Sequence, residues 1–294
     1  MHMRKTAGDV AFDVILVLLV TFVVLVTLYP VIYVASMAIS DPREALLGNV
    51  IFLPRGFSLE ALKTVVRNSQ LWRYYGNTLW YTGVGTTLNV LTTVLMAYPL
   101  ARKKFFLGKF FVLFVLFTMF FNAGIIPNYL VVVRLGLYNS RWALILPTLA
   151  TAWYVIICRS FFLSLPDELF ECAEMEGASE FTILGKIVMP LSKPVIAVLT
   201  IYYGTTHWNS FFPALLYLSD KNKFPLQIYL RQVVIQASPE ALEGIDTEAF
   251  GQQMLSLMQV KYAVVIVAIL PVILFYPLLQ KYFVKGVLVG AVKG

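Results

Sequence analysis

Charged residues are scarce in this sequence. Asp, Glu, Lys and Arg make up 13% of its 294 residues, about half the share found in an average soluble domain. Hydrophobic residues make up 59%, and the mean hydropathy is +0.78. This composition excludes a compact water-soluble enzyme, a disordered chain and a fibrous repeat. It indicates a protein embedded in a membrane.

Residues that commonly hold metals or carry out catalysis are also few. The two cysteines, Cys158 and Cys172, exclude a disulfide scaffold and a cysteine-rich metal site. The two histidines, His2 and His207, leave little for a histidine-based metal site or catalytic cluster. We therefore expect no metal site and no catalytic residue in this chain.

Six stretches without a charged residue are long enough to span a membrane. A helix needs roughly 17–25 residues to cross the hydrocarbon core of a bilayer, and it satisfies its own backbone polar groups in lipid. The sequence therefore predicts an all-α integral membrane protein with six transmembrane helices. The predicted spans are Val14–Ser40, Tyr74–Ala101, Phe110–Val133, Trp142–Cys158, Pro194–Ser219 and Tyr262–Gln280.

The distribution of basic residues predicts which loops face the cytoplasm. Lys and Arg divide almost equally between the two sets of loops, so their number alone does not decide the orientation. Two basic clusters contain no acid, at residues 102–109 and in the C-terminal tail, and they favour cytoplasmic termini. The first span is about twice as long as the core of a signal peptide, so we expect an uncleaved anchor.

The sequence gives the chain no means of its own to drive transport. The six runs contain no Asp, Glu, Lys or Arg, whereas ion-coupled carriers commonly place charges within the membrane. His207 is the only histidine in these runs, and a lone buried histidine is more often structural. The phosphate-binding pattern G-x-x-x-x-G-K-[ST] is missing. The pairs Gly108-Lys109 and Gly185-Lys186 could end such a pattern, but Lys103 and Glu180 occupy the positions of its first glycine. We expect no cofactor in this chain, with ATP and Mg²⁺ on a partner ATPase.

The predicted spans contain residues that interrupt helices. Each proline removes a helical hydrogen bond, and interrupted helices line the pathways of many transporters. Proline is also commoner in membrane helices in general, which is the alternative explanation. The strongest candidate for a break is the segment 122–128, which contains Gly124 and Pro127.

An acidic segment, residues 167–180, follows the fourth predicted span. It carries six carboxylates, and no Lys or Arg occurs within residues 160–185. Ser164 is predicted to start a short helix, Gly177 to end it in a left-handed conformation and Ser179 to start the next. The segment has an apolar side that needs cover, and its acids disfavour an anionic lipid surface. We expect it to dock with a basic partner; a solvated polar linker is the alternative.

A spaced pattern of residues runs through this segment and beyond it. Glu171-Cys172-Ala173 is followed after three residues by Gly177, and after nine more by Ile187-Val188-Met189-Pro190. The pattern resembles the E-A-A, Gly, I-x-L-P signature loop of the permease subunits of bacterial ABC importers. Cys172, Glu176 and Met189 depart from the signature but are conservative in size or charge.

Other stretches resemble the carbohydrate branch of this family, the maltose-type and oligosaccharide permeases. They are Lys193-Pro194, Trp208-Asn209-Ser210-Phe211-Phe212 with Pro213, and the tail Tyr282–Gly294. The resemblance implies a single transmembrane permease domain over residues 1–294. It places a cytoplasmic coupling helix between the fourth and fifth spans, in a loop at 164–190, and an outer loop at 220–261.

The resemblance also implies which residues meet the ATPase. In the family, the coupling helix lies in a cleft of the ATPase subunit, where the first Glu of the signature contacts a basic residue. Glu171 has that place here, small residues allow close approach, and the C-terminal tail is a second contact or an ordinary basic anchor. The expected coupling residues are Glu171, Ala173, Glu174, Gly177, Ala178, Ile187, Pro190 and Lys293.

Residues suited to bind sugar lie in the third and fifth predicted spans. A sugar ring has apolar faces and a polar rim, so aromatic rings and amides can bind it. The expected pathway residues are Asn122, Asn128, Trp208, Asn209 and Phe212. Packing or hydrogen bonding between helices is the alternative for each. At the outer mouth, Arg134 and Arg231 are compatible with an acidic saccharide.

The sequence therefore predicts a permease subunit of an ATP-driven oligosaccharide importer in the bacterial inner membrane, and not an enzyme. Its expected partners are a second permease subunit, two ATPase subunits, an extracytoplasmic solute-binding protein that meets the outer loop, the oligosaccharide and membrane lipid, without nucleic acid. An ion-coupled secondary transporter and an intramembrane enzyme are the alternatives. Whether the saccharide is acidic, as in alginate or pectin, or neutral stays open, as does the identity of the second permease.

Overall fold

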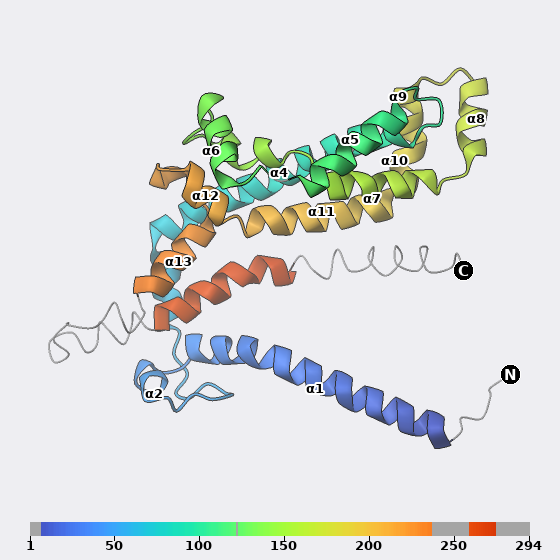
Figure 1. Ribbon diagram of the computed structural model, residues 1–294. Helices are drawn as coiled ribbons and strands as arrows, with labels where there is room; N and C mark the ends of the chain where they lie inside the picture. The colour runs from blue at the N-terminus through green and yellow to red at the C-terminus, as the bar shows by residue number, and fades with distance from the viewer. Residues whose placement is uncertain (1–6, 122, 237–258, 275–294) are drawn as a thin grey trace. The chain divides into compact units, whose positions relative to one another are not determined.

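The computed structural model describes residues 7–121, 123–236 and 259–274, and every regular element within them is helical (Figure 1). Contacts divide these residues into two compact units. The first lies within residues 1–69 and 230–271, and the second within 70–229 and 272–294. The predicted all-α class is confirmed for the described part of the chain.

The first unit contains a long apolar helix near the N-terminus. Its elements are α1 (Ala7–Ala38), α2 (Pro42–Leu46), α3 (Glu60–Arg67), most of α13 (Leu226–Gln236) and most of the helix Gln259–Leu274. Helix α1 is long enough to cross a membrane, and its apolar side chains are exposed, as on a surface that lipid covers. Gln259 fixes the end of α1 by donating to the carbonyl oxygens of Met37 at 3.0 Å and Ser40 at 2.6 Å.

The second unit contains the residues of the predicted coupling loop and pathway. Its helices are α4 (Ser69–Ala101), α5 (Gly108–Phe120), α6 (Ile125–Arg134), α7 (Ala152–Leu163), α8 (Asp167–Met175), α9 (Glu180–Ile183), α10 (Met189–Leu191), α11 (Lys193–Trp208) and α12 (Phe212–Tyr217). The 3₁₀ turns η1 (Arg141–Leu144), η2 (Leu146–Thr148) and η4 (Lys221–Lys223) and the π-helical turn η3 (Leu184–Val188) connect them.

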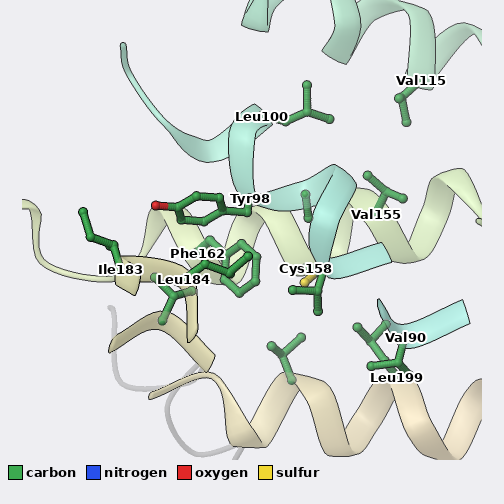
Figure 2. Close-up of a cluster of buried hydrophobic side chains, with 14 of the residues drawn as sticks. Val90, Tyr98, Leu100, Val115, Val155, Cys158, Phe162, Ile183, Leu184 and Leu199 are labelled. Carbon is green, nitrogen blue, oxygen red and sulfur yellow. The ribbon is translucent and has the colours of Figure 1, made fainter. Parts of the chain in front are cut away.

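The main hydrophobic core of the second unit joins α4, α7 and α11 with the helices of the acidic segment. Figure 2 shows Tyr98 of α4, Phe162 of α7 and Leu184 of η3 gathered together. The rings of Tyr98 and Phe162 pack edge to face, with centroids 6.5 Å apart. A second core cluster, around Tyr81, Ile145 and the residues of α12, surrounds the other end of α4.

The predicted spans are realised in different ways. The first and second correspond to single helices, α1 and α4, each long and apolar enough to cross a membrane. The third is interrupted between Phe120 and Ile125, where the axes of α5 and α6 differ by 116°. The fourth is interrupted between η2 and α7, where the direction changes by 51°. The break predicted at 122–128 is confirmed, since Gly124 has a φ of +84° immediately before α6.

The fifth and sixth spans are shorter than predicted within the described residues. The run 194–219 is divided into α11 and α12, with Pro213 in the first turn of α12. The helix Gln259–Leu274 covers part of the sixth span, and residues 275–280 of that span lie outside the described residues. Counting each bent pair of helices as one span gives up to 5 spans within the part of the chain that the structure describes, so the number six stays a prediction.

Helix α4 connects the two ends of the second unit. At one end Arg102, which follows α4, forms an ion pair with Glu174 of α8. At the other end, the side-chain amide of Asn77 donates to the carbonyl oxygen of Asn222 at 2.7 Å. The loop after α4 therefore lies with the acidic segment, and the loop after α12 lies at the opposite end (Figure 1). This is the alternation of loops that the predicted spans require.

Candidate functional site

The acidic segment forms two short helices around a tight turn. Gly177 lies between α8 and α9 with a φ of +77°, a left-handed conformation that glycine adopts without strain. The hydroxyl oxygen of Ser179 accepts a hydrogen bond from the backbone N–H of Thr182 and so caps α9. The roles predicted for Gly177 and Ser179 are confirmed.

The start of α8 differs from the prediction. Ser164 does not cap it: its hydroxyl donates to the carbonyl oxygen of Phe161 at 2.7 Å and so belongs to the end of α7. Pro166 stands at the N-cap position, and α8 begins at Asp167. Because Pro166 fixes its own φ and has no N–H, the chain turns there without a side-chain cap.

One face of α8 packs against the chain itself. Phe170 and Ala173 are buried in the main core, with Ala173 only 7% exposed. Ala178 and Ile187 are partly buried against the same core. The small residue Ala173 thus allows α8 to lie close to its own unit, and its role in coupling stays a prediction. This intramolecular packing covers part of the apolar side of the acidic segment, while Leu169 stays 38% exposed.

The opposite face of α8 is open to solvent. Cys172 is exposed on it, and Met175, near its end, is 82% exposed. Glu171 is also exposed but lies nearer the loop after α4, where it lines a hollow with Arg102 and Lys103. Gly177 and Pro190 are also exposed. Among the expected coupling residues of the described chain, Glu171, Gly177 and Pro190 are therefore placed where a second protein has access.

Glu174 is held within the chain. Its carboxylate accepts hydrogen bonds from Lys104 and from Arg102, which follow α4. The bond from Lys104, together with that from Arg102, lowers the pKa of Glu174 below its ordinary value. These partners of Glu174 were not predicted, although the opposite charges of residues 102–104 and of the acidic segment were a signal.

A small pocket brings together two of the expected pathway residues. Asn128 of α6 and Phe212 of α12 line a hollow of about 190 Å³ with Gly124, Pro213 and Tyr217. Phe212 is 52% exposed. The pocket forms where two helix interruptions meet, after α5 and before α12. It offers an aromatic face, an amide and a phenol, which suit the faces and rim of a sugar ring.

The other two described pathway residues lie outside this pocket. Trp208 is buried, and its ring packs edge to face on Tyr75 with centroids 5.8 Å apart. Asn209 is exposed, and its side chain accepts a hydrogen bond from Gln227 at 3.2 Å and donates to the carbonyl oxygen of Thr205 at 3.0 Å. The remaining expected site residues, Asn122 and Lys293, lie outside the described residues.

A buried polar chain crosses the second unit beside the interruption in the fourth span. His207 Nε2 lies 2.7 Å from the side-chain oxygen of Asn89. The amide of Asn89 donates to the carbonyl oxygens of Thr148 and, at 3.1 Å, Leu149. Asn89 of α4, which is held by His207 of α11, thus supplies hydrogen bonds to backbone groups that the break leaves without helical partners. The structural role expected for His207 is confirmed, while its partner Asn89 was not predicted.

A second pair of side chains serves the other side of the same break. The hydroxyl of Tyr203 on α11 lies 2.8 Å from that of Thr93 on α4. The Tyr203 hydroxyl also accepts a hydrogen bond from the backbone N–H of Thr151 at 3.2 Å. Thr151 immediately precedes α7. Polar side chains in this region therefore stabilise an interrupted helix.

Fold and site define a helical membrane protein with a solvent-exposed acidic element at one end of its second unit. The chain belongs to the family of binding-protein-dependent transport system inner membrane components, whose sequence model matches residues 84–289. It is a non-catalytic inner-membrane component of an ABC transporter. The resemblance stated from the sequence is confirmed.

Three relatives represent the matches to known proteins. Protein LplC of Bacillus subtilis is 38% identical over 292 residues, which cover 99% of this chain and 98% of that protein. The polygalacturonan/rhamnogalacturonan transport system permease protein YtcP of Bacillus subtilis is 37% identical, with 96% and 98% covered. A crystal structure of a bacterial ABC transporter involved in the import of the acidic polysaccharide alginate contains a chain that is 31% identical. Its TM-score is 0.87, and the match covers 96% of this chain and 100% of that one.

Proposed function

We propose that this chain is a permease subunit of an ATP-driven importer of acidic oligosaccharides and forms half of its translocation pathway. A second permease subunit would form the other half. Two ATPase subunits would bind the end that carries α8, and an extracytoplasmic solute-binding protein would deliver the oligosaccharide at the opposite end. The observation that carries the proposal is the exposed Glu171 on α8, a helix whose other face is fixed to the chain's own core.

The division of labour between subunits follows from the residues of this chain. The ATPase subunits would bind ATP and Mg²⁺, whose hydrolysis supplies the energy. This chain would receive their movement through Glu171, in contact with a basic groove, and through the exposed turn at Gly177. The acidic surface of α8 would make the encounter faster and select against acidic partners. Membership in an ABC transporter family also disfavours an ion-coupled secondary transporter.

The class of substrate is inferred from relatives and from the chemistry of the unit's outer end. YtcP is named for polygalacturonan and rhamnogalacturonan, and the transporter of known structure imports alginate. In this chain Arg141 lies at the end opposite α8, where its guanidinium donates to Asn77 at 2.9 Å and lies 5.3 Å from the ring centre of Trp80. A cation beside an aromatic face suits a sugar ring that carries a carboxylate.

Uptake by cells that carry the complete transporter tests this substrate class. We expect labelled oligogalacturonate or alginate oligomers to enter about tenfold faster than neutral arabino-oligosaccharides, the factor that one charge-assisted contact of about 1.4 kcal/mol supplies. Deleting the chain should abolish uptake, and so should depletion of ATP. Preference for the neutral sugar would contradict the acidic substrate, and uptake driven by a proton gradient without ATP would contradict the ABC mechanism.

Cys172 gives a direct test of the side of the membrane on which α8 lies. We expect a membrane-impermeant maleimide to modify Cys172 in inside-out vesicles but not in intact right-side-out cells, because α8 is proposed to face the cytoplasm. Bound ATPase subunits should slow the modification. Cys158 is buried and is the internal control, since it should react only after denaturation. Modification of Cys172 from outside the cell would contradict the proposed orientation.

A further inference from the structure

Arg102 contacts both helices of the acidic segment. It stands one residue beyond the end of α4, and its side chain is only 13% exposed. Its guanidinium forms an ion pair with Glu174 of α8 and another, at 3.2 Å, with Glu180 of α9. The centre of the guanidinium also lies 4.6 Å from the centre of the Phe170 ring. One side chain thus joins the end of α4 to α8 and α9 together.

Neighbouring side chains strengthen this connection on both sides of the Gly177 turn. The hydroxyl of Tyr98, in the last turn of α4, donates to Glu180, and Lys104 forms an ion pair with Glu174. The two carboxylates therefore stand on opposite arms of a hairpin and are both bonded to the end of α4. A partly buried network of this kind is more rigid than isolated surface ion pairs.

Helix α4 extends from this end to the far end of the unit. It is unbroken over 33 residues, a length of about 50 Å. Near its start, Asn77 donates to the carbonyl oxygens of Asn222 at 2.7 Å and Phe224 at 3.0 Å. The hydroxyl of Thr78 accepts a hydrogen bond from the backbone N–H of Leu226 at 2.8 Å, where α13 begins.

We propose that Arg102 is a positioning residue of the transport cycle. It fastens the acidic segment to α4, so that displacement of α8 by the ATPase subunits moves α4 as a rigid body. Through Asn77 and Thr78, that movement reaches the loop before α13 at the opposite end. The inference rests on the proposed function, because it requires an ATPase at α8. The role of Arg102 differs from that of Glu171. Glu171 contacts the ATPase subunit, whereas Arg102 transmits the displacement of α8 to α4.

The Arg102→Gln variant tests this role in the complete transporter, reconstituted in proteoliposomes with the solute-binding protein. Three quantities are measured on one preparation: the ATPase subunits that co-purify with the permease, the rate of ATP hydrolysis and the substrate imported per ATP. The matched control is Lys103→Gln. Lys103 also pairs with α8, through Asp167, but its side chain is 76% exposed, so this pair contributes little.

We expect Arg102→Gln to assemble with its ATPases and hydrolyse ATP while import per ATP falls by about tenfold, the size of an ordinary coupling energy between two sites. Arg102→Lys keeps a charge but cannot bridge two carboxylates and stack on Phe170 as the planar guanidinium does, and it should fall in between. Lys103→Gln should resemble the wild type.

Three results would overturn the role of Arg102. They are unchanged import per ATP in Arg102→Gln, an equal loss in Lys103→Gln, and failure of both Arg102 variants to assemble although they insert in the membrane. The last result would make Arg102 a folding residue. Failure of the proposed function is distinguishable, because it predicts that the wild-type chain itself neither binds ATPases nor supports ATP-dependent import.

Discussion

Replacing Glu171 by lysine is expected to abolish transport, because the permease will no longer assemble stably with its ATPase subunits. The carboxylate is exposed, and the inner face of α8 is fixed by Phe170 and Ala173, so the helix should stay folded in the variant. Removing one partner of an interfacial ion pair costs about 2–5 kcal/mol. Even the lower value corresponds to about a 30-fold loss of affinity, and a reversed charge adds repulsion.

The measurement is co-purification of the ATPase subunits with the tagged permease, together with ATP-dependent uptake. Glu168→Lys is the matched control, because it makes the same change of charge on an exposed residue one turn earlier in α8. If the net charge of α8 were decisive, the two variants would lose binding equally. We expect Glu168→Lys to keep most of its binding. Normal assembly of Glu171→Lys would contradict the contact proposed for Glu171.

The parts of the fold that the sequence predicted are those that depend on short stretches of chain. Helices α1 and α4 follow from long uncharged runs, which need no knowledge of their neighbours. The cap at Ser179 follows from a hydroxyl that bonds to the backbone of the next turn, and the turn at Gly177 follows from the missing Cβ atom, which permits a positive φ. The break before α6 follows from Gly124 for the same reason.

Features that depend on contacts between distant segments were not predictable in the same way. Glu174 pairs with Arg102, 72 residues earlier in the chain, and Ala173 is buried in a core that includes Phe162 of α7. A sequence pattern indicates that α8 has an apolar face but not which surface covers that face. Trp208 likewise has the chemistry of a sugar-binding residue, yet Tyr75 covers it.

The polar chain through His207 was visible only in part from the sequence. His207 was expected to be a hydrogen-bonded structural residue, but its partner is 118 residues away. The contacts also define which ring nitrogen of His207 carries a proton. Because the amide nitrogen of Asn89 donates to two carbonyl groups, the amide oxygen faces His207 and can only accept. Nε2 of His207 therefore carries the proton, and the neutral ring suffices for the whole network.

Gly85 makes room for this ring, and its replacement is expected to destabilise the protein. A Cβ atom at residue 85 would lie 2.5 Å from Nε2 of His207, whereas one at Gly83 would have no atom within 4 Å. The His207 ring is buried and held by Asn89, so it cannot move aside without breaking its hydrogen bond to the side chain that serves the Thr148–Leu149 break. Gly85→Ala should lower the free energy of unfolding by about 1–3 kcal/mol, as overpacking does in other cores.

Thermal unfolding of the purified chain in detergent measures this effect, with Gly83→Ala as the matched control on the same helix. Alanine favours a helix over glycine by about 1 kcal/mol, so the control should be as stable as the wild type or more stable. Adding His207→Asn to Gly85→Ala shortens the side chain that the new Cβ meets, and the two changes should then cost less together than separately, by about 1 kcal/mol. Equal stability of the Gly83 and Gly85 variants, or strict additivity in the double variant, would mean that the ring does not occupy the space beside Gly85.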